Sequence, residues 1–264
     1  MKAYDFELDN KRLSSFDCIL CSFGEKGLET VSDGCQITFN TMPTMGGSKH
    51  NLMSTEYEDC LETTLQICKY SCDGGIQEIT ATEHRELTKW LGRRKFLKFK
   101  ILDEDYIDLY FEAAFNISRI EIDGKLYGLE LEVKTNRPFA LKEPRTIIVK
   151  NSTQNGKHSV NDTSYEEGYI YPYTKITVNE SGNLKIHNAI ENRDTYIANC
   201  VAGEVITLDY PVIQSSISSH NIQNDFNWNF FRIANTYENS RNDLTISLPC
   251  SIEIKYSPIV KVGL

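Results

Sequence analysis

The sequence lacks the features that mark several large classes of protein. Its 264 residues contain no apolar run close to the roughly 18 residues of a membrane-spanning helix, so we expect no membrane partner. The first ten residues, MKAYDFELDN, are polar from the start and have no apolar stretch typical of a signal or transit peptide. These absences predict a protein that is made and kept in a cytoplasm, or released from it by lysis.

Positive charge is also scarce. The formal net charge is −9, with 17 basic and 24 acidic residues in 1–140 and 11 and 13 in 141–264. Neither half is basic, which argues against a partner bound through its phosphate backbone. The one basic cluster precedes the acidic residues 103–105, so we interpret it as a solvated helix end and strand face rather than a nucleic-acid patch. It consists of Arg93, Arg94, Lys95, Lys98 and Lys100.

Motifs for catalysis are missing as well. The sequence has no nucleophile elbow, HExxH zinc motif, Walker A motif or GxGxxG motif. His84 has no nucleophile or acid placed near it in the sequence, so a packed histidine is favoured over a catalytic base. No pair of carboxylates is singled out for glycosidase chemistry, which needs two that face one cleft. We therefore predict no enzyme, no catalytic residue, no cofactor and no metal.

Cysteine is the exception, with eight residues. Cys18 and Cys21 have the spacing of metal ligands, and Cys68 and Cys72 are one residue further apart. The first pair lies in the apolar run FDCILCSF, which is typical of a strand, so the two thiols should point to opposite faces. We expect buried, reduced cysteines rather than a zinc site, and cytoplasmic synthesis disfavours disulfides. The other four are Cys35, Cys60, Cys200 and Cys250.

What the first half does contain is alternation of apolar and polar residues, which predicts half-buried strands. The clearest case is a long hairpin over 106–135, with Asp123-Gly124 as its turn. One helix is predicted over 80–92, where Thr80 and Glu83 have capping-box spacing and Gly92 is placed to end the helix in the left-handed conformation.

Residues 40–58 interrupt this pattern. Pro43 and Gly46-Gly47, among polar residues, predict a long loop or projecting arm. The Gly-Gly-Ser-Lys piece is not a phosphate-binding loop, because the upstream glycine of that motif is missing. We expect the arm to contact a neighbouring molecule through Met42, Pro43, Met45, His50, Leu52, Met53 and Tyr57.

The second half begins after Asn136-Arg137-Pro138. Residues 150–167 are predicted to be a loop, and residues 145–149 an edge strand or a link between domains. About seven short strands then recur every ten residues or so, which is typical of a β-sandwich or jelly roll.

Aromatic residues of this half have two interpretations. Phe226, Trp228 and Phe230 alternate with Asn227 and Asn229, so we expect these three rings to be core residues on one face of a strand over 226–233. The alternative is a sugar-binding surface, in which Trp228 stacks on sugar rings together with Tyr171, Tyr173 and Tyr210.

An ordered series of segments resembles the distal tail protein (Dit) family of tailed bacteriophages, and it covers nearly the whole chain. The opening FELDNKRLSSFDCIL, the segment EHRELTKWLG followed by DYIDLYFE, and LELEVKTNRPFA are similar to the first domain of that family. The units SGNLKIHN and GEVITLDY, and the closing FNWNFFRIAN, NDLTIS and IEIKYSPIVKVG, are similar to its second domain.

The resemblance implies a mainly β fold, with a β-barrel-like ring-forming domain with one α-helix over 1–140 and a galectin-like β-sandwich over 145–264. It implies a structural protein of the virion that forms a hexameric ring with itself, through whose lumen DNA passes. The ring would join the tail tube protein to the tail hub or tail-associated protein, and carry receptor-binding or side-fibre proteins.

Galectins hold sugar through H-x-N-x-R and W-x-x-E-x-R. His187-Asn188, His220-Asn221 and the residues after Trp228 do not match those motifs. The resemblance therefore favours an adaptor over a sugar binder. A carbohydrate-binding module stays open as an alternative, as does the equivalent baseplate component of a contractile tail or tail-like bacteriocin.

Overall fold

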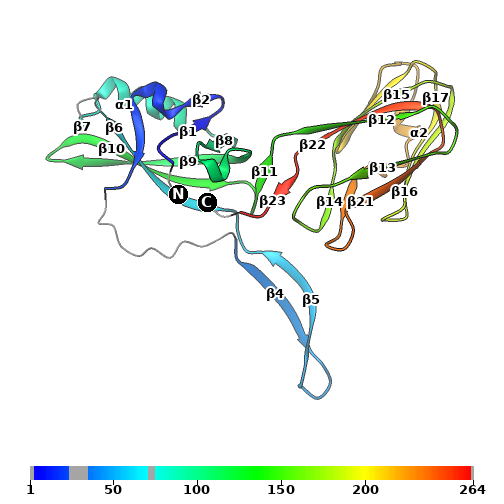
Figure 1. The fold of residues 1–264 in the computed structure, drawn as a ribbon, viewed down its shortest axis with the longest axis horizontal. Helices are drawn as coiled ribbons and strands as arrows, with labels where there is room; N and C mark the ends of the chain where they lie inside the picture. The colour runs from blue at the N-terminus through cyan, green and yellow to red at the C-terminus, as the bar shows by residue number, and fades with distance from the viewer. Residues whose placement is uncertain (1–2, 24–34, 71–74, 263–264) are drawn as a thin grey trace. The chain divides into compact units, whose positions relative to one another are not determined.

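The computed structural model describes residues 3–23, 35–70 and 75–262. The chain forms two compact units, Met1–Lys142 with Val260–Leu264, and Glu143–Ile259 (Figure 1). Cys72 lies outside the described residues. Within the described ranges, no helix combines the length and the apolar character needed to cross a bilayer. The fold is mainly β, as predicted.

The first unit is built on a curved sheet with the strand order β2-β1-β8-β9-β10-β6-β3. The backbone N–H of Leu20, in β3, donates to the carbonyl of Tyr4, just before β1, at 2.9 Å. Strand β3, at one end of this order, thus meets the residues just before β1, near the other end, and the sheet closes like a barrel. The strands are β1 (Phe6–Leu8), β2 (Lys11–Arg12), β3 (Cys18–Cys21), β6 (Glu62–Tyr70), β7 (Ile76–Gln77), β8 (Leu97–Ile101), β9 (Leu109–Ile122), β10 (Lys125–Thr135), β11 (Ala140–Lys142) and β23 (Ile259–Val260), with 3₁₀ turns η1 (Leu13–Phe16) and η2 (Glu104–Tyr106).

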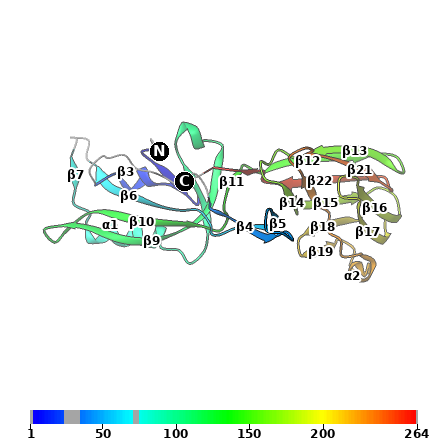
Figure 2. The same ribbon diagram turned by 90° about the horizontal axis from the view of Figure 1, so that it is seen from below.

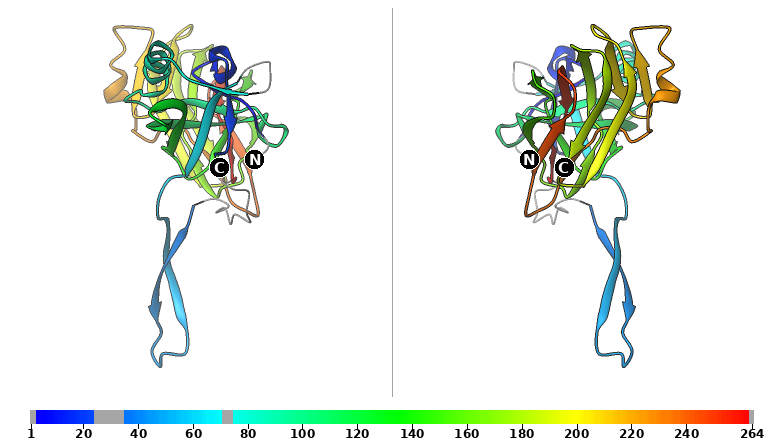
Figure 3. Two further views of the ribbon diagram at one scale, coloured as in Figure 1. Left: turned by 90° about the vertical axis from the view of Figure 1, so that its left-hand side faces the viewer. Right: turned by 90° about the vertical axis from the view of Figure 1, so that its right-hand side faces the viewer.

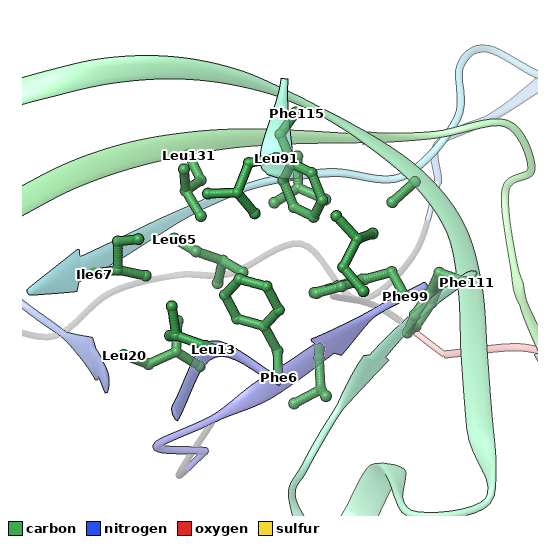
Figure 4. Close-up of a cluster of buried hydrophobic side chains, with 14 of the residues drawn as sticks. Phe6, Leu13, Leu20, Leu65, Ile67, Leu91, Phe99, Phe111, Phe115 and Leu131 are labelled. Carbon is green, nitrogen blue, oxygen red and sulfur yellow. The ribbon is translucent and has the colours of Figure 1, made fainter. Parts of the chain in front are cut away.

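Aromatic rings fill the centre of this barrel (Figure 4). Phe6 lies 5.4 Å from Phe99 and 6.1 Å from Phe115 between ring centroids, and all three side chains are buried. Trp90 stacks on Phe6 at 5.7 Å, and its indole N–H donates to the carbonyl of Leu8 at 3.2 Å. The packing of the Trp90 ring and the hydrogen bond of its indole N–H together hold the helix that carries it against the sheet.

That helix, α1 (Ala81–Leu91), begins as predicted with a capping box between Thr80 and Glu83. Its end differs from the prediction, because Gly92 has a φ of −79° and is not left-handed. A Cβ at this position would lie 2.8 Å from the carbonyl oxygen of Thr88, so glycine is required here by close packing of the backbone.

The predicted long hairpin is confirmed as β9 and β10 (Figure 1). Asp123 and Gly124 both have positive φ, 51° and 76°, which is the geometry of a type I′ turn. The strand begins at Leu109, and Ile107 is exposed. On β9 the last buried side chain is that of Phe115, and beyond the partly buried Ile117 its outer residues are largely exposed, whereas β10 keeps Leu129 and Leu131 in the core.

The second unit is a β-sandwich (Figure 2). A five-stranded sheet, β12-β22-β15-β18-β19, and a four-stranded sheet, β13-β21-β16-β17, enclose one apolar core. The residues 145–149, expected as an edge strand, lie in β12 at the edge of the first sheet. The elements are β12 (Arg145–Asn151), β13 (Gly156–Asn161), β14 (Gly168–Ile170), β15 (Tyr173–Val178), β16 (Gly182–Asn188), β17 (Arg193–Cys200), β18 (Val205–Asp209), β19 (Val212–Ser215), α2 (Ile222–Asp225), β20 (Ile233–Asn235), β21 (Arg241–Ile246) and β22 (Cys250–Tyr256).

The loop expected over 150–167 is partly wrong, because it contains strand β13, paired with β21. This strand buries Val160 but has few other apolar residues. His158 is half-buried, and its ring lies 3.1 Å from the amide oxygen of the buried Asn151. A hydrogen-bonded polar residue at an inward position conceals the alternation that marks a strand.

The end of the chain also differs from the expected second domain over 145–264. Strand β23 pairs with β11, and Val260 is buried in the core of the first unit. Two covalent connections therefore join the units, one after Lys142 and one before Val260.

A buried carboxylate joins the β17–β18 turn of the sandwich to the end of β19 and the loop that follows it. Glu204 is fully buried and accepts hydrogen bonds from the Ser215 hydroxyl at 2.5 Å, His220 Nδ1 at 2.6 Å and the Val201 N–H at 2.9 Å. Burial alone would raise the pKa of this carboxyl group, but the three hydrogen bonds outweigh it and the pKa lies below its ordinary value.

Replacing Glu204 with Ala is expected to lower the free energy of unfolding by about 3 kcal/mol at neutral pH, because buried partners lose their acceptor. A carboxyl group whose pKa is depressed by folding stabilises the protein above its unfolded pKa, about 4.3, and this contribution is lost as pH falls through the folded pKa. Urea unfolding at pH 7 and pH 4 should show a smaller acid loss in Glu204→Ala than in wild type. Glu180→Ala, at an exposed acid of the same unit, is the control; equal acid losses in wild type and Glu204→Ala would contradict this account.

Candidate assembly surfaces

Residues 40–58, predicted as a long loop or arm, lie largely in a β-hairpin. Strands β4 (Ile37–Pro43) and β5 (His50–Tyr57) form a two-stranded sheet of their own and extend away from the barrel of their unit (Figure 3). At the tip, the N–H of Thr44 donates to the carbonyl of Lys49 at 2.8 Å. The segment expected to be a long loop or projecting arm thus consists mainly of two paired strands, with residues 44–49 as the turn between them.

The strand register gives the hairpin two unlike faces. Ile37 lies opposite Tyr57, and Thr41 lies opposite Leu52, so these side chains share one face with Phe39. We call this the apolar face; it consists of Ile37, Phe39, Thr41, Pro43, His50, Leu52, Thr55 and Tyr57. The polar face consists of Thr38, Asn40, Met42, Asn51, Ser54 and Glu56.

The apolar face is open to solvent. Phe39 is 62% exposed and Leu52 57%, and Met53, at the bulge in β5, is 63% exposed. An isolated two-stranded hairpin is marginally stable in water. Exposed apolar surface of this kind is typical of an interaction site. The face therefore has the character of a surface that another molecule covers.

The structure brings some of the predicted contact residues together and separates others. Pro43, His50, Leu52 and Tyr57 lie on the apolar face, whereas Met42 is on the polar face. Met45 is fully exposed at the tip.

Sequence reasoning missed Ile37 and Phe39, which lie just before the segment that was singled out. Their alternation with Thr38 and Asn40 was the available signal.

In the sandwich, the expected group of three core aromatics is only partly found. Phe226 and Phe230 are buried, but Trp228 is 56% exposed and has a φ of 59°. The predicted strand over 226–233 is irregular until Ile233. The reason is Asn227, whose side chain accepts from the N–H groups of Tyr196 and Asn229 and donates to the carbonyl of Asp194. These bonds hold the backbone away from strand geometry and turn Trp228 outward.

The cysteine pair has the strand geometry that was expected. Cys18 is buried in β3 and Cys21 is half-buried three residues on. Burial is the main reason that the pKa of the Cys18 thiol rises to about 12, which leaves it protonated and unreactive at neutral pH. In the described ranges, no three His, Cys, Asp or Glu residues are placed to hold a metal ion.

His84, considered as a catalytic base, lies in α1 with its Nε2 3.4 Å from the hydroxyl of Thr88. Partial burial, aided by the charge of Arg119, lowers the pKa of its imidazole.

Both halves of the chain match models of known protein families. A family model described as "Phage tail protein N-terminal domain" matches residues 1–137, and one described as "Phage tail C-terminal domain" matches residues 139–256. A search of curated proteins finds no match.

Among solved structures, the chain is similar to the Dit protein (gp 19.1) of SPP1, which is described as a paradigm of the hub adsorption apparatus in phages that infect Gram-positive bacteria. The TM-score is 0.66 at 10% sequence identity, over 97% of this chain and 99% of that chain. Such a likeness shows a shared fold over the whole length. With two phage tail domains matched in order along that length, the chain belongs to a family of bacteriophage tail proteins.

Proposed function

We propose that the protein is the distal tail protein of its phage, a structural and non-enzymatic component that joins the tail tube to the tail tip or baseplate hub. Copies of the barrel unit would associate into a hexameric ring around a lumen for DNA. The sandwich would serve as an adaptor for host-recognition proteins. The chain would be made in the host cytoplasm and function in the virion.

The observation that carries this proposal is the uncovered apolar face of the β4–β5 hairpin. A ring forms when one surface of a subunit binds a different surface of the next, with a rotation that closes the circle. A hairpin that exposes Phe39 and Leu52 is suited to such a head-to-tail contact. Full burial of each large apolar side chain contributes about 1.5–3 kcal/mol, before the cost of association.

A second surface suits the receiving side of this contact. Strand β9 pairs with β8 only over Phe111–Ala113, and among the described strands only β10 pairs with its outer part, from Asn116 to Ile122. Edge backbone groups of this kind accept a further strand. Ile122 is 53% exposed at the end of this edge, so an incoming hairpin would also find an apolar side chain.

Charge supports a channel for DNA. Residues 1–140 hold 24 acidic and 17 basic side chains, so the ring-forming unit has a net negative charge. A lumen with net negative charge repels phosphate groups and lets DNA pass without binding.

Shortening the hairpin is expected to abolish the ring and spare the fold. Ile37 and Tyr57 are cross-strand partners, so residues 38–56 can be replaced by Asn-Gly, a two-residue turn that suits this position. The variant should keep the thermal unfolding midpoint of wild type, because the hairpin shares no sheet with the barrel. Light scattering and negative-stain electron microscopy, with and without the tube and hub proteins, measure assembly. A wild-type chain that stays monomeric even with both partners would refute the ring.

A point substitution tests the apolar face itself. Phe39→Ser should change the free energy of unfolding of the monomer by less than about 0.5 kcal/mol, because the Phe39 side chain is largely exposed. It should weaken subunit association at least about tenfold, because a central aromatic contact is lost. Asn51→Ala, on the polar face, is the matched control. Sedimentation velocity over a concentration series gives the association constant of each variant, and urea unfolding gives its free energy of unfolding. Equal weakening of association by the two substitutions would remove the apolar face from the interface.

A further inference from the structure

Six aromatic side chains of the sandwich form one continuous series of ring contacts. Tyr171 stacks on Tyr210 with centroids 4.3 Å apart and ring planes 10° apart, and Tyr210 meets the edge of Phe230 at 5.3 Å. We call the series the aromatic run; it consists of Tyr169, Tyr171, Tyr210, Phe230, Phe226 and Trp228. Three separate parts of the chain supply it, which are strand β14 with the residues after it, the β18–β19 turn, and the segment after α2.

Exposed and buried rings are combined in the aromatic run. Tyr169, Tyr210 and Trp228 are each 56% exposed, whereas Phe226 and Phe230 are 4% exposed. Tyr210 and Trp228 both contact Phe230, with centroids 5.3 and 6.4 Å from it. The buried phenylalanines therefore hold the exposed rings in place, and the exposed rings form a rigid surface.

The backbone at Trp228 supports a role in binding. Left-handed φ is unfavourable for a bulky residue, because its Cβ then lies too close to the following carbonyl oxygen. The hydrogen bonds of Asn227, at 3.0–3.2 Å, maintain this conformation. Backbone strain of this kind is concentrated at functional sites. In this case the strain places a large indole in solvent, where it adds little to folding.

Polar groups held in fixed positions lie at the other end of the run. The Arg232 guanidinium lies 3.9 Å over the ring of Tyr169 and binds Glu191 through two nitrogens, at 2.5 and 2.9 Å. Both charged side chains are less than one fifth exposed, so their positions are set before any ligand arrives. A guanidinium group has five N–H donors and a carboxylate has about four acceptor positions, so this pair has capacity for further hydrogen bonds with hydroxyl groups.

We infer that the aromatic run is a carbohydrate-binding site that takes the pyranose rings of a surface polysaccharide. The C–H faces of sugar rings are weakly positive and are attracted to the negative faces of Trp228, Tyr210 and Tyr169. Hydroxyl groups would bind Arg232 and Glu191. This inference does not depend on ring assembly, and it does not use the galectin motifs that the sequence lacks.

The surroundings of the exposed rings favour a sugar over a protein partner. A protein interface surrounds its aromatic anchors with apolar residues depleted of charge. Here the chain neighbours of Trp228 are Asn227 and Asn229, and Asp209 precedes Tyr210. A hydrated ligand rich in hydroxyl groups suits such a mixed surface better than an apolar protein patch does.

The test uses the full chain, fluorescently labelled, on an array of glucan, galactan, rhamnose-containing and N-acetylhexosamine-containing oligosaccharides. The best-bound oligosaccharide is then titrated into wild type and each variant by isothermal calorimetry, and tryptophan fluorescence is recorded for the variants that keep Trp228. The chain has two tryptophans, and Trp90 is buried, so a change in emission reports on Trp228. We expect saturable binding that Trp228→Ala and Tyr210→Ala each weaken about tenfold or more, because one stacking contact is lost.

Matched variants separate this site from folding and from assembly. Trp228→Tyr should retain part of the affinity, since a ring is kept. Phe39→Ser, at an exposed aromatic residue of the other unit, should weaken assembly and leave sugar binding unchanged. Urea unfolding of each variant identifies any that fail to fold, and Tyr210→Ala serves if Trp228→Ala is one of them. No saturable binding to any array glycan, binding that survives both alanine substitutions, or equal loss in Phe39→Ser would each overturn the inference.

Discussion

The first unit depends on the closure of its sheet. Because β3 returns to the residues before β1, the longer strands of the barrel turn one set of side chains into a common interior. Phe6, Phe99 and Phe115 fill that interior, and Trp90 fixes the helix across it. A closed barrel has few free edges and no open face of its own. The surfaces left for partners are therefore the parts of the chain that the closed sheet excludes.

Two excluded parts have complementary characters. The strands of the β4–β5 hairpin pair along their length apart from one bulge, but no core lies beneath its apolar face. The outer half of β9 pairs with β10 along one edge, and no other described strand pairs with its second edge. One part lacks a covering surface and the other lacks a strand partner. Contact between copies of the chain, as in the proposed ring, would satisfy both needs.

The sandwich differs from the first unit in what its surface requires for stability. Its core is complete without further partners, and buried polar side chains such as Glu204 and Asn151 hold the loops at its ends. Its surface therefore needs no covering for stability. The exposed rings of Trp228 and Tyr210 contribute little to folding, yet they are rigidly held. Rigid exposed aromatic rings lose little entropy on binding, which makes them suited to recognition.

Local patterns in the sequence determined much of this protein. Alternation, the Asp123-Gly124 turn and the capping box at Thr80 specify the β9–β10 hairpin and α1, because each depends on residues close in the chain. The closure of the barrel, the return of Val260 to the first unit and the outward turn of Trp228 were decided only by the tertiary structure. Each depends on contacts between residues distant in sequence, such as Asn227 with Tyr196, and alternation carries no information about those contacts.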